Sequence, residues 1–462
     1  MKTTFVYAKK EYSVPGILLH KALPVFCMSI AIIYLAKAYL AWSWLGVILS
    51  IVCVLSVIIS LPFVKGNTRV VALALFAAGV ILFFSSEAEA GLWLSAVAKN
   101  ANLVTLLVLV PIFGLPLEHG GYYKVLDALV DRFMNNNHRM FWVPALLGHF
   151  FGALMNMGAL PIVYQLIMHG NRSSAFRAVP AAIVRGFCSS IYWSPNMVSV
   201  ALVISYLALP WAIFARGGLI FTLLSLVVGW VIHIVFNRKN TPYSGKDKPK
   251  STLNAKKLLE LVIFCSLFLG VIVIIAVETT VPVFNVVPLL ALVYPVLWLG
   301  LLGKGKVIYS AYRSYVTTAL PGYASEIVMF LGAGFLASAL LHSGSGEKIS
   351  LLFGQLAGLS PCLLCFLLAF SIVLMSLVGI MPMVTVTAYC ASLQPALLGL
   401  STEQLSLVLV GGWATSVLAS PFTGITLIMS GLMRKSSLSV ARSNWLYAAV
   451  MLALISAVPL LS

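Results

Sequence analysis

Hydroxyl and amide side chains surround two prolines that interrupt apolar segments in the two halves of this chain. Residues 189–196 read SSIYWSPN, and residues 415–423 read TSVLASPFT, so that each segment contains Ser-x-x-x-Ser-Pro. The corresponding residues are Ser190, Ser194 and Pro195 in the first copy and Ser416, Ser420 and Pro421 in the second. A proline within a helix removes a backbone donor and frees carbonyl groups, which lipid cannot satisfy. Two breaks at matching positions of an apolar chain therefore indicate the binding site of a transporter.

A Gly-x-x-Pro-x-Val element precedes each break and gives the halves a second feature in common. It comprises Gly158, Pro161 and Val163 in the first half and Gly379, Pro382 and Val384 in the second. At such interruptions, helix N-termini favour an anion such as a carboxylate, whereas unwound carbonyls and hydroxyls favour a small cation. The predicted sodium ligands are Asn156, Ser189, Ser190 and Asn196, with Ser376, Thr415, Ser416 and Thr423 as their counterparts. Alternatively, the serines and threonines bond back to their own helical turn or join neighbouring helices.

The few charged residues in the apolar segments are further candidates, because charge is costly inside a bilayer. Arg185 lies nine residues before Ser194, and Glu326 lies at a similar estimated depth in the segment 320–342. Arg185 can attract an anionic substrate, pair with Glu326, or extend to the inner membrane surface. His149 is a candidate proton relay, with a packing role as the alternative. Neither the breaks nor the tips of the segments before them contain Asp or Glu, which argues against a carboxylate relay there.

The composition is that of an integral membrane protein. Hydrophobic residues make up 61% of the 462 residues and charged residues only 9%, whereas soluble domains carry about a quarter charged residues. The apolar segments are long enough to span a bilayer and recur along the chain. The net charge of +17 comes from basic residues in short loops, which marks a cytoplasmic face and not a nucleic-acid partner. The sequence therefore predicts an all-α polytopic protein of a bacterial-type inner membrane.

We expect about eleven transmembrane helices and two re-entrant hairpins, with the N-terminus inside and the C-terminus outside. Residues 1–41 form an extra span, 42–236 a first repeat, 237–257 a basic cytoplasmic linker, and 258–462 a second repeat of opposite orientation. The hairpins are expected at 140–169 and 351–393, and the broken helices at 176–206 and 403–433. For each hairpin, a single tilted helix or two complete spans remain the alternatives.

This pattern resembles the ion transporter superfamily, in particular the divalent anion/sodium symporters. The resemblance rests on Ser194, Pro195 and Asn196 in the first break and on Ser420, Pro421 and Thr423 in the second. It implies one extra N-terminal span, two inverted five-span repeats, elevator-like movement and a homodimer. The hairpin tips depart from the Ser-Asn-Thr motif of those symporters. Here the first tip keeps only Asn156, and the second keeps at most Ser376.

The sequence thus predicts a secondary transporter of a small organic anion, coupled to sodium or protons. No cofactor other than the coupling ion is expected. A cation/proton antiporter of the same superfamily is one alternative, and the lack of carboxylates at the breaks argues against it. A membrane enzyme acting on a lipid-linked substrate is another. It would need a cluster of acidic or histidine side chains near an interface, and no nucleotide-binding motif is present for a pump.

Overall fold

The fold is entirely helical in the part of the chain that the structure, a computed structural model, describes. These residues are 14–134, 136–168, 178–236 and 254–460, and they contain no strand. Ten helical segments among them are long and apolar enough to cross a membrane, by length and composition. The protein is therefore an all-α polytopic membrane protein, as the sequence predicts.

The first half of the described chain runs from α1 to α12. Its helices are α1 (Val14–Leu40), α2 (Trp44–Ser60), α3 (Gly66–Ser85), α4 (Ala90–Val97), α5 (Ala101–Leu109), α6 (Leu115–His119), α7 (Tyr123–Phe133), α8 (Asn137–Met155), α9 (Ala159–Ile167), α10 (Val179–Ile191), α11 (Val198–Tyr206) and α12 (Trp211–Phe236). The helix α8 ends at Met155, and the short helix α9 follows after a single turn, Asn156–Gly158.

The second half runs from α13 to α23 and has a similar order of long and short helices. Its helices are α13 (Ala255–Glu278), α14 (Val283–Leu301), α15 (Gly305–Ser314), α16 (Ala324–His342), α17 (Ser345–Leu359), α18 (Pro361–Leu377), α19 (Pro382–Ser392), α20 (Thr402–Ala419), α21 (Gly424–Met433), α22 (Ser437–Arg442) and α23 (Trp445–Ser456).

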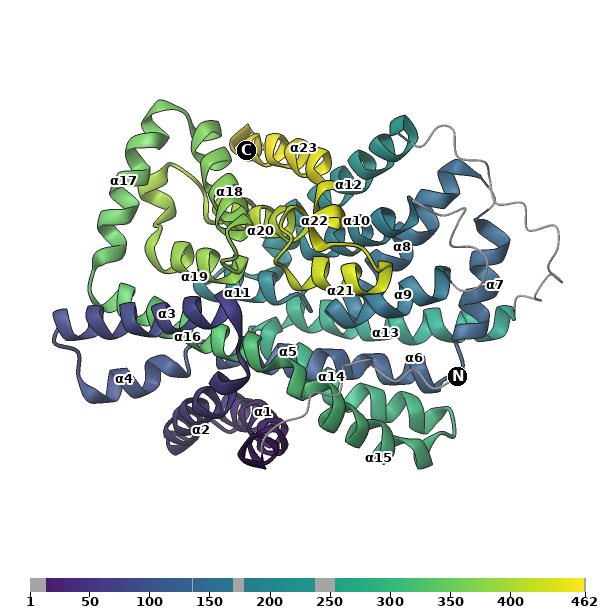
Figure 1. The fold of residues 1–462 in the computed structure, drawn as a ribbon, viewed down its shortest axis with the longest axis horizontal. Helices are drawn as coiled ribbons and strands as arrows, with labels where there is room; N and C mark the ends of the chain where they lie inside the picture. The colour runs from purple at the N-terminus through teal and green to yellow at the C-terminus, as the bar shows by residue number, and fades with distance from the viewer. Residues whose placement is uncertain (1–13, 135, 169–177, 237–253, 461–462) are drawn as a thin grey trace.

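The interrupted helices lie at the centre of the molecule, between the two helix pairs that precede them in sequence. Figure 1 places α8 and α9 on the right, α18 and α19 on the left, and α10 and α20 between them. Helix α8 packs along α10, and α18 packs along α20, while α10 and α20 contact one another. Glycine permits the first of these contacts, because a Cβ atom on Gly186 would lie only 2.0 Å from the carbonyl oxygen of Ala145.

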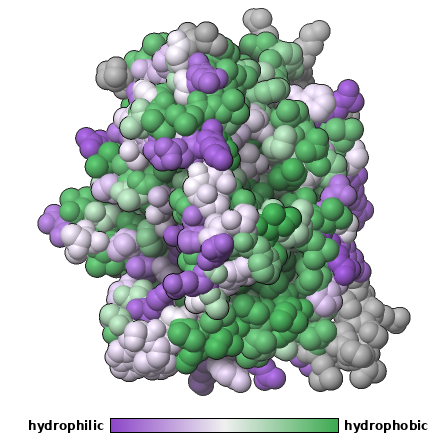
Figure 2. All heavy atoms as spheres, turned by 90° about the vertical axis from the view of Figure 1, so that its left-hand side faces the viewer, coloured by the Kyte–Doolittle hydropathy of each residue, from purple (hydrophilic) through white to green (hydrophobic). Residues whose placement is uncertain are grey.

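Large apolar side chains are exposed along the outer helices. Examples on α3 and α12 are Ile81, Phe84, Leu223 and Val235. The face in Figure 2 likewise has broad hydrophobic areas, separated by narrower hydrophilic ones. An apolar exterior of this extent is suited to contact with lipid chains.

Two expected boundaries need correction. The segment 351–393 is not a single hairpin, because a new helix, α18, begins directly after Ser360. The Ser360 hydroxyl caps this helix by accepting a hydrogen bond from the Leu363 N–H at 3.4 Å. Only α18 and α19 therefore form the hairpin, and α17 is a separate helix before it. The expected linker 237–257 also ends earlier, because α13 begins at Ala255; residues 237–253 lie outside the described part of the chain.

Candidate functional site

The first break separates α10 from α11 by the six non-helical residues 192–197. The Ser194 hydroxyl donates a hydrogen bond to the Ala153 carbonyl in the last turn of α8, at 2.9 Å. The Asn196 side-chain amide donates to the same carbonyl at 2.6 Å. The hydroxyl of Ser194 also accepts the Asn196 backbone N–H at 3.3 Å. The break is thus held against the hairpin by two side chains, and both are fully buried.

The second break, at residues 420–423, repeats these contacts in the other half. The Ser420 hydroxyl donates to the Ser376 carbonyl in the last turn of α18, at 2.6 Å, and accepts the Phe422 backbone N–H at 3.2 Å. The backbone N–H of Ser420 donates to the Ser416 carbonyl at 3.0 Å, and Ser194 makes the same bond to Ser190 at the same distance. In each half, the backbone N–H of the Ser-Pro serine makes the last hydrogen bond of its helix. The hydroxyl of the same serine anchors the following loop to the preceding hairpin.

Two tryptophans complete the match between the breaks. The indole N–H of Trp211, at the start of α12, donates to the Trp193 carbonyl at 2.9 Å. The indole N–H of Trp445, at the start of α23, donates to the Ala419 carbonyl at 3.0 Å. In both halves the accepting carbonyl is the one just before the Ser-Pro serine. From sequence these two residues resemble ordinary interfacial anchors, because a tryptophan near a helix end usually has that role.

Four of the predicted sodium ligands donate their hydroxyl hydrogen within their own helix. Ser189 and Ser190 donate to the carbonyls of Gly186 and Phe187, both at 2.6 Å. Thr415 donates to the Gly411 carbonyl at 2.8 Å, and Ser416 donates to the Trp413 carbonyl at 2.7 Å. These bonds are the back-bonding alternative raised from sequence, although each oxygen keeps lone pairs that can still accept.

Two other predicted ligands have buried oxygens that no donor reaches. These are the side-chain oxygen of Asn196 and the hydroxyl of Ser376, one beside each break. A buried polar atom without a partner is costly and calls for an explanation, and a bound cation is one. Among the described residues, no group of three or more His, Cys, Asp or Glu side chains is placed to hold a metal ion. A cation here would therefore be bound by amide, hydroxyl and carbonyl oxygens.

The remaining predicted ligands stabilise the turns themselves. The Asn156 side chain accepts the Met157 backbone N–H at 2.8 Å, and its backbone has a positive φ of 54°. The Thr423 hydroxyl donates to the Val417 carbonyl at 2.8 Å, which satisfies a carbonyl that the break leaves without its helical partner. Both side chains lie at the interruptions, as predicted, but each is engaged by local backbone.

The two Gly-x-x-Pro elements do not have equivalent geometry. Gly379 has a φ of +94°, which favours glycine, whereas Gly158 has a φ of −59°, which any residue can adopt. The hairpin tips nevertheless reach the second break from two directions. A Cβ atom on Gly424 would lie 3.3 Å from the Met157 sulfur, and one on Gly379 would lie 4.0 Å from the Phe422 ring.

His149 joins α8 to the first break through a chain of hydrogen bonds. Its Nδ1 lies 2.7 Å from the Ser189 hydroxyl oxygen, and its Nε2 lies 3.4 Å from the Trp193 indole nitrogen. The Ser189 hydroxyl hydrogen is directed to Gly186, so Nδ1 must be the donor, and Nε2 then accepts from Trp193. One neutral tautomer satisfies all of these bonds, which is the packing role considered from sequence.

Arg185 does not pair with Glu326, which was one of the three alternatives open from sequence. The Arg185 guanidinium donates from Nε to the Asn444 side-chain oxygen at 3.1 Å and from an Nη atom to the Ser443 carbonyl at 3.0 Å. No ion pair joins it to Glu326, although both side chains belong to the described chain, and one Glu326 carboxylate oxygen is buried without a partner. A similar depth in the bilayer fixes neither the helix face nor the neighbouring helix.

Comparison with known proteins adds evidence on the fold. No family profile and no curated protein sequence matches the chain. The structure is similar to that of the YdaH transporter of Alcanivorax borkumensis, described as having an unusual topology, with a TM-score of 0.57, 14% identity, and coverage of 84% of this chain and 98% of that one. The structure also matches that of MtrF of Neisseria gonorrhoeae, described within a class of antimetabolite efflux pumps. That match has a TM-score of 0.45 and 12% identity, and it covers 84% of this chain and 83% of that one. The first likeness establishes a shared fold.

Proposed function

We propose that this protein is a secondary transporter that carries a small organic anion across the bacterial inner membrane, coupled to sodium or protons. The observation that carries the proposal is the pair of matched breaks. In each half, a buried Ser-Pro serine donates to the last turn of the first arm of the preceding hairpin. Interrupted helices at membrane depth persist where protein or a polar cavity satisfies the freed backbone, as at transporter binding sites. The shared fold with a protein described as a transporter supports the same function.

The ends of the short helices supply complementary charges for an anion and a cation. Helices α11 and α21 begin directly after the breaks, so their N-termini direct unpaired N–H groups and partial positive charge towards the loops. A carboxylate suits that position. The unpartnered oxygens of Asn196 and Ser376 suit a small cation beside it. Binding of both ions at neighbouring sites would couple their movements, because each ion lowers the electrostatic cost of the other.

The contacts between the halves support an inverted-repeat, elevator-like arrangement. Helix α9 contacts α21, and α19 contacts α11, so that the second arm of each hairpin lies against the second part of the other half's broken helix. Helices α12 and α23 are tied to the breaks by Trp211 and Trp445. We take the hairpins, the broken helices, α12 and α22–α23 as the moving unit, and the remaining long helices as the scaffold.

A ligand screen on the purified full-length protein tests the function. Thermal unfolding is followed with succinate, citrate or benzoate, each in sodium chloride and in choline chloride. We expect at least one anion to raise the unfolding midpoint more in sodium than in choline, or, for proton coupling, more at acidic than at neutral pH. Uptake of that anion into proteoliposomes should then depend on the same ion gradient. Uptake that persists without any ion gradient, against the anion's own gradient, would refute secondary transport.

A further inference from the structure

A cavity of about 400 Å³ lies beside the first broken helix, away from the break itself. Its walls come from the start of α10, the end of α12, the turn after α21, and α22 with the start of α23. Ile191, the last residue of α10, lies six residues beyond Arg185, which corresponds to about 9 Å along the helix axis, and no residue of either break lines the cavity. The cavity is therefore separate from the site proposed for transport, and the inference below does not rest on that function.

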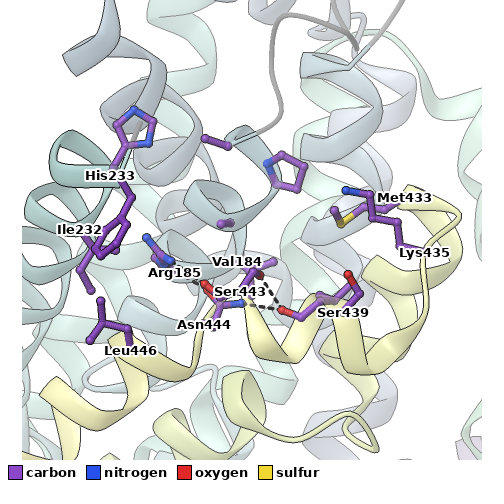
Figure 3. A pocket seen from close by; sticks show the side chains of 15 residues that line it. Val184, Arg185, Ile232, His233, Met433, Lys435, Ser439, Ser443, Asn444 and Leu446 are labelled. Atoms are coloured by element: carbon purple, nitrogen blue, oxygen red, sulfur yellow. Dashed lines mark hydrogen bonds between the residues drawn. The ribbon is translucent and has the colours of Figure 1, made fainter. Parts of the chain in front are cut away.

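The cavity carries positive charge and no carboxylate among the residues that line it. Figure 3 shows Arg185 next to Asn444, with His233 and Lys435 on opposite sides of the view. Apolar side chains form the rest of the wall, including Met433, Phe236 and Leu446. The lining is thus suited to a ligand with an anionic group and an adjoining apolar part.

Arg185 is a buried cation that lacks a counter-charge in the described chain. Its side chain is only 6% exposed, and its bonds go to neutral acceptors: Asn444, Ser443 and, at 3.4 Å, the carbonyl of Gly229. A guanidinium has five N–H donors, so two have no acceptor among the described residues. The Tyr447 ring lies 5.5 Å from its central carbon, which offers a cation–π contact but no full charge. Burial of a cation in this way is costly unless an anion joins it.

We propose that this cavity binds an oxyanion, the carboxylate or phosphate group of an amphipathic ligand, with Arg185 as its fixed anchor and Lys435 as a second, exposed cation. The planar guanidinium presents paired donors to such a group. The bonds from Arg185 to Asn444 and Ser443 set its orientation in advance, so little side-chain entropy is lost on binding. The ligand is either a free anion or the headgroup of an anionic lipid, since Phe236 and Leu446 are exposed at the rim.

The test measures thermal unfolding of the purified full-length protein with two pairs of probes. Inorganic phosphate is compared with chloride at equal ionic strength, and dihexanoyl phosphatidylglycerol is compared with dihexanoyl phosphatidylcholine. We expect a saturable rise in the unfolding midpoint with phosphate or with phosphatidylglycerol, beyond that with its paired control. A response to phosphate alone identifies a free anion, and tighter binding of phosphatidylglycerol than of phosphate identifies a lipid headgroup.

Substitutions separate this cavity from general attraction of anions. Lys435→Gln should weaken the apparent affinity at least threefold while the protein still folds, because its side chain is exposed. Arg442→Gln removes the same charge nearby, from an exposed residue that does not line the cavity, and should leave affinity unchanged. Arg185→Lys keeps the charge but not the paired donors and should weaken binding further. The proposal is overturned if neither probe exceeds its paired control, or if Arg442→Gln and Lys435→Gln act equally.

Discussion

Ser420 combines two hydrogen bonds in one small side chain, and both hold the second break in shape. Its hydroxyl donates to the Ser376 carbonyl and accepts the Phe422 N–H. We predict that Ser420→Ala lowers the free energy of unfolding by about 1–2 kcal/mol, because the Ser376 carbonyl loses one of its two donors and the Phe422 N–H loses its acceptor. Uptake of the transported anion should fall at least tenfold, since the loop is no longer fixed to the hairpin.

Ser85→Ala is the matched control for that change. Ser85 is exposed at the end of α3, and its hydroxyl bonds only to the Leu82 carbonyl of its own helix. Unfolding followed by tryptophan fluorescence and uptake into proteoliposomes should both be unaffected. Equal uptake by the Ser420→Ala variant and the unmodified protein would remove Ser420 from the site.

Trp445 fixes the carbonyl next to Ser420 through a single N–H group. Trp445→Phe keeps an aromatic ring at the start of α23 but leaves the Ala419 carbonyl without this donor. We predict a severalfold rise in the KM for the transported anion with a small loss of stability, about 1 kcal/mol. Trp44→Phe, at an exposed position in α2, is the control. An unchanged KM in the Trp445 variant would assign this bond to packing alone.

At the scale of residues, sequence predicted the positions of the breaks better than their partners. The effect of proline and serine on a helix can be predicted from local sequence, because it depends on the adjacent backbone. The partner of Arg185 cannot be predicted in this way, since Asn444 is distant in sequence and lies in the turn between α22 and α23, which the tertiary fold brings to Arg185. The tryptophan contacts were missed for the same reason.

At the scale of elements, close helix contacts set the positions of the broken helices. A Cβ atom on Gly186 would lie 2.0 Å from a backbone oxygen of α8, whereas one on Gly412 would lie 2.7 Å from the Ile372 methyl and 3.1 Å from the nearest backbone atom, the Cα of Ala369. We predict that Gly186→Ala lowers stability by about 1–3 kcal/mol, at the upper end of that range, and Gly412→Ala by less. Gly270→Ala in α13 meets nothing within 4 Å and should be neutral or slightly stabilising.

Thermal unfolding in one detergent ranks the three glycine variants. The order depends on how close the nearest backbone atom of the neighbouring helix lies, so the ranking tests the packing itself. A Gly186→Ala variant as stable as Gly270→Ala would show that α8 and α10 are farther apart than described.

Sequence predicted the breaks and hairpins as elements, because Gly, Pro and Ser interrupt otherwise continuous apolar segments. It did not separate α17 from α18, since the apolar composition continues across Ser360 and Pro361. Proline is compatible with the first turn of a helix, and a serine N-cap before it signals a start as readily as an interruption. Only the change in chain direction distinguishes the two readings, and composition does not encode that.

At the scale of the whole molecule, the proposed moving unit meets the scaffold at the tip of the second hairpin. A Cβ atom on Gly379 would lie 3.5 Å from the Asn67 side chain of α3 and 4.0 Å from the Phe422 ring. Asn67 belongs to the scaffold, and Phe422 belongs to the second break. An elevator-like shift of the unit must move both Gly379 and Phe422 away from Asn67, because neighbours at this range do not stay together through a displacement of several ångströms.

A reducible cross-link between these two positions tests that movement. Asn67→Cys and Phe422→Cys are combined in a background with Cys362→Ser, which removes the one cysteine that is not fully buried. A short bifunctional methanethiosulfonate should then lower uptake at least tenfold, and a reducing agent should restore it. The single-cysteine proteins, treated in the same way, should keep full uptake. Undiminished transport by fully cross-linked protein would mean that α3 and the second break stay together throughout the cycle, so that access would have to alternate by local opening of the hairpins instead.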